Sequence, residues 1–172
     1  MPLVVKRIAQ ARRPALALAL CLAAFAAGCT QQESTSASNL PTGESAPGSA
    51  AAFVRPADLA ATLRGTGPKP LLLHVGFQVL YKGGAIPGSH YAGPGSTPEG
   101  LALLAAAVKD VPHEQPIVIY CGCCPWDHCP NMGPAFKQLH EMGYTHVKAL
   151  YTPKNLEDDW VNKGYPIEKP AL

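Results

Sequence analysis

Four cysteines crowd one short segment in the second half of this 172-residue chain, Cys121-Gly122-Cys123-Cys124-Pro125-Trp126-Asp127-His128-Cys129. The preceding run, Ile117-Val118-Ile119-Tyr120, is short, apolar and mostly β-branched, which is typical of a buried strand. A helical pattern begins near Pro134. We therefore expect Cys121 in a loop between a strand end and a helix N-terminus. Unpaired backbone N–H groups and the helix dipole stabilise a thiolate there, so Cys121 is the candidate nucleophile.

The other three cysteines leave several alternatives open. In an exported protein, clustered cysteines usually form disulfides, and Cys124 with Cys129 would close a small loop. Cys121, Cys124 and Cys129 also have the spacing of a thiolate metal site, with His128 or Cys123 as the fourth ligand. Zinc fits such a set, and the adjacent pair Cys123-Cys124 suits Cu(I). One of Cys123, Cys124 and Cys129 could instead act as a resolving cysteine for Cys121, and Cys124 or Cys129 could reach it more easily. All three could also remain free thiols.

The remaining loop residues are candidates for contacts with a substrate: Gly122, Trp126, Asp127 and His128. His128 could bind metal or lower a thiol pKa, or simply be a solvated histidine. Trp126 is expected to pack or act as a lid. Outside this segment, we expect Asn131 to cap the following helix, and His74 and Trp160 to lie in the core.

The N-terminus predicts export. Lys6, Arg7, Arg12 and Arg13 precede an apolar stretch from Ala15 to Ala27, so residues 1–28 have the pattern of a secretory signal peptide. Ala26-Ala27-Gly28 before Cys29 resembles a bacterial lipobox, which implies lipidation of Cys29 and anchoring to a membrane. Thr30 after that cysteine favours the periplasmic face of the outer membrane. Residues 29–52, rich in Ser, Gly, Pro, Ala and Thr, are expected to form a flexible tether.

Residues 53–172 have the length of a single domain. The whole chain carries 14 Lys and Arg against 12 Asp and Glu, and four of the basic residues fall in the signal segment. The mature chain then has 10 basic and 12 acidic residues, a net charge of −2. A mildly acidic chain without a basic stripe argues against nucleic-acid binding.

Strands and helices alternate along the expected domain, which indicates an α/β fold with a mostly parallel sheet. The strands are expected at residues 71–75, around 90–91, at 117–120 and at 146–150. The helices are expected at 56–63, from Thr97 as N-cap onward, at 134–142 and at 156–163. Gly143 and Gly164 are expected to cap the last two helices.

Several motifs in this order resemble the rhodanese-like family. Tyr81-Lys82-Gly83-Gly84-Ala85-Ile86-Pro87-Gly88-Ser89 is similar to the family's Tyr-x-x-Gly-His-Ile-Pro-Gly-Ala stretch. Ile117 to Cys121 resembles its strand and active-site cysteine. Gly143-Tyr144-Thr145-His146-Val147 and the segment from Trp160 to Ile167 resemble its later motifs. The resemblance implies the rhodanese-like fold over residues 53–172.

The resemblance also implies a loop whose backbone N–H groups surround Cys121. Such a cysteine accepts a sulfane sulfur and passes it to a small thiol, so we expect a sulfurtransferase that acts on small sulfur or thiol compounds without a cofactor. The chain departs from the family at His74-Val75-Gly76, where Asp-Val-Arg is usual, and in its longer, Cys-rich loop. The alternative is therefore a non-catalytic Zn- or Cu-binding protein that uses residues 121–129.

Overall fold

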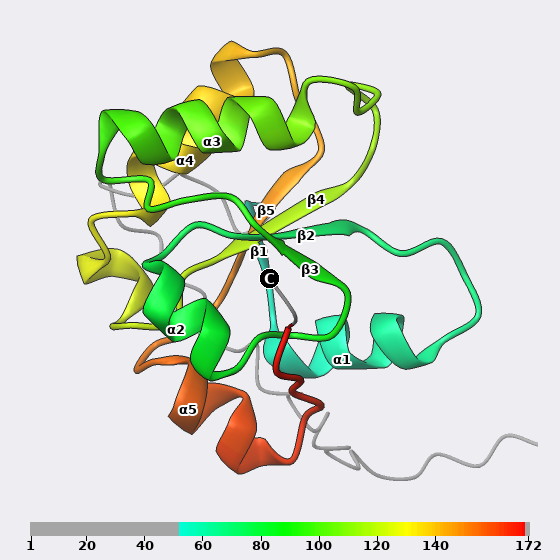
Figure 1. Ribbon diagram of the computed structural model, residues 1–172. Helices are drawn as coiled ribbons and strands as arrows, with labels where there is room; N and C mark the ends of the chain where they lie inside the picture. Colours follow the sequence, from blue (N-terminus) through cyan, green and yellow to red (C-terminus); the bar gives the residue numbers. More distant parts are fainter. Residues whose placement is uncertain (1–51, 171–172) are drawn as a thin grey trace, which may run out of the picture. The chain divides into compact units, whose positions relative to one another are not determined.

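The computed structural model describes residues 52–170, and the predicted signal segment, Cys29 and nearly all of the tether lie outside them. Five strands form one parallel sheet in the order β1-β5-β4-β2-β3 (Figure 1). They are β1 (Phe53–Val54), β2 (Leu71–His74), β3 (Ser89–Tyr91), β4 (Ile117–Tyr120) and β5 (Val147–Leu150). The predicted α/β class is confirmed, and β4 is the central strand. No helix among the described residues is long and apolar enough to cross a membrane.

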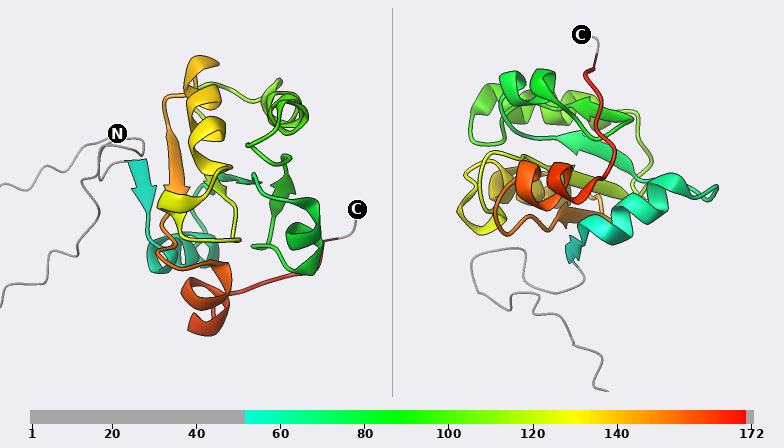
Figure 2. Two further views of the ribbon diagram at one scale, coloured as in Figure 1. Left: turned by 90° about the vertical axis from the view of Figure 1, so that its left-hand side faces the viewer. Right: turned by 90° about the horizontal axis from the view of Figure 1, so that it is seen from below.

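Helices cover both faces of the sheet (Figures 1 and 2). α3 (Pro98–Val108) and α4 (Met132–Glu141) lie on one face, and α1 (Pro56–Arg64) and α5 (Leu156–Asp159) lie on the other. The short helix α2 (Gln78–Gly83) follows β2, and short 3-10 turns lie at Trp126–His128 and Val161–Lys163.

The alternation of side chains along β4 creates two cores. Ile117 and Ile119 pack with the residues under α3 and α4, whereas Val118 and Tyr120 pack with those under α1 and α5. Successive side chains of a strand point to opposite faces. Cys121, the next residue, therefore returns to the α4 side, and it belongs to the first core.

Local sequence signals account for most helix ends. α1 and α3 begin at prolines in the first helical position, and the Thr97 hydroxyl accepts a hydrogen bond from the Gly100 N–H at 3.0 Å, as an N-cap does. Gly143 and Gly164 have positive φ, consistent with their predicted capping roles. The predicted last helix is wrong in one respect, because it is divided in two at Trp160, whose side chain is completely buried.

Candidate active site

Cys121 lies immediately beyond the C-terminal end of the central strand, as expected from the sequence. Its side chain is 4% exposed. Gly122 follows with φ +91°, a conformation that L side chains rarely adopt. This turn carries the chain sharply away from β4 and places Cys123 beside Cys121. The Gly122 carbonyl accepts a hydrogen bond from the Leu156 N–H at 3.3 Å, which ties the turn to α5.

The four loop cysteines are free thiols that share one cluster. The sulfur of Cys123 lies 3.3 Å from that of Cys121, 2.9 Å from that of Cys124 and 3.9 Å from that of Cys129. Cys121, Cys123 and Cys129 form a group in which all three sulfurs lie within 4.8 Å of one another, and Cys124 is outside it. Cys123 is thus the centre of the cluster and the thiol best placed to react with Cys121. We had expected Cys124 or Cys129 in that role.

Asn131 holds the cluster from the side of α4. Its side chain is fully buried, and its amide N–H donates to the sulfur of Cys121 at 3.3 Å and to that of Cys129 at 4.0 Å. Its carbonyl oxygen accepts from the Ser96 backbone N–H at 3.1 Å. The expectation that this side chain caps the helix is wrong, because it makes no capping hydrogen bond to α4. Asn131 is instead a site residue that donates to the candidate nucleophile.

Gly76 closes the site from β2. A Cβ atom at this position would lie 2.7 Å from the Cys121 sulfur and 2.9 Å from Cε1 of His74, so no side chain fits without displacing the site. The rhodanese-like motif has an arginine at the position of Gly76. This chain therefore has only backbone atoms there, beside the Cys121 sulfur. The Gly76 N–H donates to Nδ1 of His74 at 3.3 Å.

His74 is the buried, hydrogen-bonded histidine expected from the sequence. It is 1% exposed and packs against the rings of Tyr81, Tyr91 and Tyr120. Burial lowers the pKa of His74 to about 4, although a hydrogen bond to the Cys121 backbone acts in the opposite direction. His74 is consequently neutral at neutral pH and supplies no positive charge to the site.

Hydrogen bonding distributes ionisation unevenly within the cluster. The hydrogen bond from Cys121 lowers the pKa of Cys129 to about 5, and one from the Asn131 backbone acts in the same direction. The same interaction with Cys129, followed by burial, raises the pKa of Cys121. Burial also raises the pKa of Cys124. The first negative charge of the reduced cluster is therefore expected on Cys129, whose sulfur lies within 4.8 Å of that of Cys121. This is the reverse of the expected thiolate on Cys121.

The side chains of the other predicted loop residues make their ring contacts and hydrogen bonds outside the group of sulfurs. Trp126 packs edge-on against Phe53 at a ring-centroid distance of 4.6 Å, so it is a packing residue. His128 and Asp127 hydrogen-bond to each other at 2.9 Å on the exposed side of the loop. His128 is not part of the close sulfur group, which argues against it as a metal ligand.

A cavity of about 400 Å³ opens beside Cys121. It lies between α2, which contributes Val79 and Leu80, and α5, which contributes Leu156 and Glu157. The remaining lining residues are His74, Gly83, Gly84, Cys121, Gly122, Val161 and Ile167. Of the loop cysteines, Cys121 is the one that lines this cavity, so a small molecule in it meets Cys121 first. This cavity could not be predicted from the sequence, because residues 78–83 show no helical pattern and α2 was not expected.

Comparisons with solved structures identify the architecture. The BH2092 protein of Bacillus halodurans superposes with a TM-score of 0.55 at 21% identity, over 69% of this chain and 77% of that one. The rhodanese-like domain of the Anabaena sp. Alr3790 protein gives 0.52 at 18% identity, over 69% of this chain and 80% of that one. This chain has the rhodanese-like fold.

A third structure with this rhodanese-like fold is the single-domain sulfurtransferase RDL2 of Saccharomyces cerevisiae. It gives a TM-score of 0.51 at 17% identity, over 67% of this chain and 93% of that one. No family model matches the chain, and no curated protein matches it either. The rhodanese-like domain is therefore recognisable by its fold, while its Cys-rich loop must be interpreted from its own geometry.

Proposed function

We propose that this rhodanese-like protein transfers or reduces sulfane sulfur through Cys121, with Cys123 as the partner thiol. The observation that carries the proposal is the 3.3 Å approach of the Cys121 and Cys123 sulfurs beside a cavity that Cys121 lines. The fold shared with a yeast sulfurtransferase supports this class of chemistry. Fold alone does not assign activity, so the sulfur cluster has the greater weight.

The first step is the activation of Cys121. The Cys121 thiol releases its proton to solvent in the cavity that it lines. The resulting thiolate attacks the terminal sulfur of a hydropersulfide donor R–S–SH in the cavity. The donor S–S bond breaks, R–S⁻ leaves, and Cys121 becomes a persulfide, Cys121–S–SH. The amide N–H of Asn131 donates to the Cys121 sulfur throughout.

The second step is the reaction of a Cys123 thiolate with this persulfide, and it has two outcomes. Attack on the outer sulfur moves the persulfide to Cys123 and restores the Cys121 thiolate, with no net redox change. Attack on the Cys121 sulfur forms a Cys121–Cys123 disulfide and releases HS⁻. In the second case the sulfane sulfur gains two electrons and the two cysteines lose them, so two equivalents of an external thiol must then reduce the disulfide.

Cys123 suits both outcomes because it is exposed while Cys121 is buried. A persulfide transferred from Cys121 to Cys123 therefore moves from the cavity to the protein surface, where an acceptor thiol can reach it. A Cys121–Cys123 disulfide is accessible to a reductant for the same reason. We further propose that the protein acts at the bacterial envelope, anchored through a lipid on Cys29, on the basis of its N-terminal sequence.

Sulfur loading is tested by mass spectrometry. The reduced protein is incubated with an organic hydropersulfide, and the expected result is a gain of one sulfur atom that maps to Cys121. Cys121→Ser should remain unmodified at this position, whereas Cys124→Ser, which alters a thiol outside the close group, should load like the wild type. Absence of the adduct in fully reduced wild-type protein with every sulfur donor tried would refute the activity.

A second candidate function is the binding of Cu(I), and the close group of three sulfurs favours it. Thiolates are soft ligands that select Cu(I), and tetrahedral zinc would need a fourth ligand that this group does not include. The ligands would be Cys121, Cys123 and Cys129, in place of the predicted set with Cys124 and His128. Titration with Cu(I) against a competing chelator should then show a loss of affinity in Cys123→Ser but not in His128→Ala. Equal affinities for these two variants would reject this ligand set.

A further inference from the structure

The walls of the cavity beside Cys121 are mostly apolar, unlike those of a site that binds a small anion. Val79, Leu80, Leu156, Val161 and Ile167 provide apolar walls. Three of these side chains are also well exposed at its edge, Val79 at 73%, Leu80 at 38% and Ile167 at 40%. Exposed apolar side chains that gather around a nucleophile indicate a ligand that covers them.

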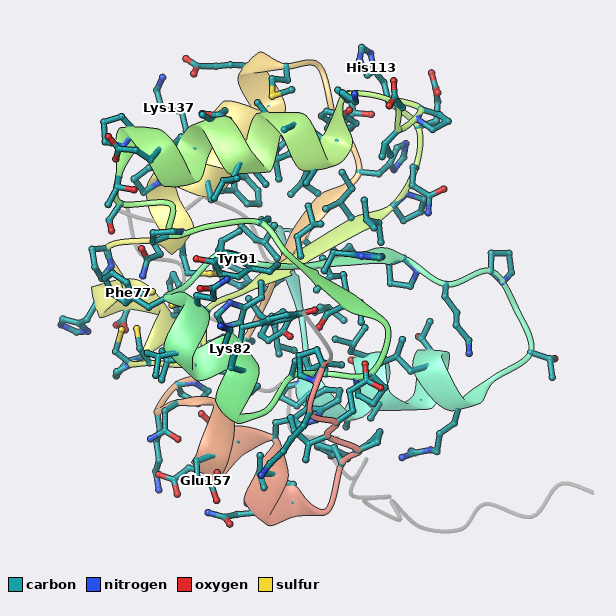
Figure 3. All side chains as sticks on the ribbon, in the orientation of Figure 1. Phe77, Lys82, Tyr91, His113, Lys137 and Glu157 are labelled. Atoms are coloured by element: carbon teal, nitrogen blue, oxygen red, sulfur yellow. The ribbon has the colours of Figure 1, made fainter. Side chains whose placement is uncertain are left out.

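The charges around the cavity also disfavour an anionic ligand. Glu157 lines it, and no lysine or arginine is among its lining residues in the described part of the chain. Figure 3 shows Glu157 on α5 and Lys82 on α2. Lys82 is exposed and does not line the cavity. An anionic ligand would approach one carboxylate without an opposite charge among the lining residues.

Gly76 explains why the site cannot recruit a cation from β2. A side chain there would collide with the Cys121 sulfur at 2.7 Å and with His74 at 2.9 Å. Among the described residues, the one side-chain donor to the Cys121 sulfur besides a thiol is the neutral amide of Asn131. The described site thus stabilises one sulfur anion by a neutral hydrogen bond and contains no side chain that would pair with a second anionic group on the donor.

From these observations we infer that the sulfur donor of this site is an organic hydropersulfide whose substituent is apolar and uncharged, and not an inorganic anion such as thiosulfate. The apolar substituent lies between α2 and α5, against Leu80 and Ile167, and its terminal sulfur faces Cys121. The donor bond between the two sulfurs breaks, the terminal sulfur remains on Cys121, and the organic thiolate leaves. This inference names the substrate class of the proposed function and therefore rests on it.

Two donors that differ in one charge test the inference. Benzyl hydropersulfide and para-sulfonatobenzyl hydropersulfide have the same reactive group, and only the second bears a fixed negative charge. The second-order rate of sulfur loading on Cys121 is measured for each by quench and peptide mapping. We expect the uncharged donor to load at least about tenfold faster. Equal rates, or faster loading from the sulfonated donor or from thiosulfate, would overturn the inference and leave the proposed function intact.

Variants locate the preference in the cavity. Leu80→Ser should slow loading by the benzyl donor about fivefold, because it removes apolar contact with the substituent. Leu103→Ser is the matched control, since Leu103 is a 50% exposed leucine on α3 that does not line the cavity. Glu157→Lys should bring the loading rates of the two donors closer together. Glu114→Lys, an equal charge change outside the cavity lining, should leave their ratio unchanged. Lys82→Gln should leave the ratio unchanged. An unchanged rate with the benzyl donor in Leu80→Ser, together with an unchanged ratio of the two donors in Glu157→Lys, would contradict the assigned cavity.

Alkylation separates failure of the inference from failure of the proposed function. N-benzyl iodoacetamide and iodoacetate modify thiols without any sulfur transfer, and their rates at Cys121 are read from the same peptide. If neither hydropersulfide loads but the benzyl reagent still alkylates Cys121 at least about tenfold faster, the sulfur-transfer function is wrong and the apolar preference of the cavity stands. If neither pair shows a preference for the uncharged reagent, the inference itself is wrong.

Discussion

The side-chain amide of Asn131 donates to the sulfur of Cys121 at 3.3 Å, and its carbonyl oxygen accepts from the Ser96 N–H at 3.1 Å. Because both halves of this buried amide are bonded, its orientation is fixed by its surroundings. The loop after the central strand thus provides a neutral, positioned donor at the atom that we propose as nucleophile. A hydrogen bond to a charged group contributes about 1.5–3 kcal/mol, enough to change reactivity by one to two orders of magnitude.

Replacing Asn131 by Asp tests this donor. Asp keeps an acceptor oxygen for the Ser96 N–H but removes the N–H that reaches Cys121 and adds a negative charge beside it. We expect sulfur loading to slow by about tenfold or more, and its pH profile to move to higher pH, because the thiolate is less stable. Asn162→Asp, at an exposed site that contacts Asp158, is the matched control. If Asn131→Asp has the loading rate and pH profile of the wild type, the Asn131 amide does not stabilise the Cys121 thiolate.

Gly76→Ala should disturb both stability and reactivity. The new Cβ would lie 2.7 Å from the Cys121 sulfur, closer than real Cβ contacts allow. We expect the free energy of unfolding to fall by about 2 kcal/mol in urea titrations, because the packed site must shift. Gly133→Ala on α4 is the control, since an added Cβ meets no atom within 4 Å there, and it should be neutral or stabilising. If the two variants have the same free energy of unfolding, the site has room for a Cβ atom at position 76 and the packing argument is wrong.

His74 predicts a dependence of stability on pH. Its pKa is about 4 in the folded protein against an ordinary value of 6.5, so the unfolded chain binds more protons between these two values. Stability should therefore decrease as the pH falls from 6.5 to 4, by up to about 3 kcal/mol from this residue. His74→Asn should reduce this slope, whereas His90→Asn, at an exposed position, should keep it. Urea unfolding at several pH values measures the difference, and identical slopes in wild type and His74→Asn would contradict the assignment.

The pKa of about 5 at Cys129 predicts one thiolate in the reduced protein at neutral pH. Titration of the thiolate absorbance in the ultraviolet should show one equivalent that appears near pH 5. Cys129→Ser should remove that step, and Cys121→Ser should move it to higher pH, because the hydrogen bond from Cys121 is the main cause of the lowered pKa. If the step persists in Cys129→Ser, the charge belongs to another cysteine of the cluster.

Local sequence patterns determine some elements of this fold, and tertiary contacts determine others. The β-branched run Ile117–Tyr120 has few alternatives to a buried strand, so the placement of Cys121 at its end was predictable. α2 was not predicted, because Phe77, Val79 and Leu80 are exposed and Tyr81 is its one buried residue, which leaves no apolar periodicity. The division of the last helix at Trp160 depends on burying that indole and on its hydrogen bond to the Pro166 carbonyl, both of which are tertiary contacts.

Within the site, the sequence indicated the cluster of four cysteines but not which of the sulfurs lie closest together. From the sequence, Cys124 or Cys129 was favoured over Cys123 as the partner of Cys121, because a sequence pattern does not show that Gly122 turns with positive φ. The role of Asn131 was hidden for a similar reason. An Asn before a helix usually caps it, and only the position of Ser96, 35 residues earlier in the chain, shows that its side chain turns toward the sulfurs instead.

A single-turnover trapping experiment tests the central claim most directly. One equivalent of hydropersulfide is mixed with the reduced protein, and samples are quenched over time for peptide mapping and sulfide assay. The account predicts a persulfide on Cys121 first, followed by either a persulfide on Cys123 or a Cys121–Cys123 disulfide with one equivalent of sulfide. In Cys123→Ser, the Cys121 persulfide should persist. Sulfur that appears first on Cys123, Cys124 or Cys129, or that leaves Cys121 equally fast in Cys123→Ser, would contradict the account.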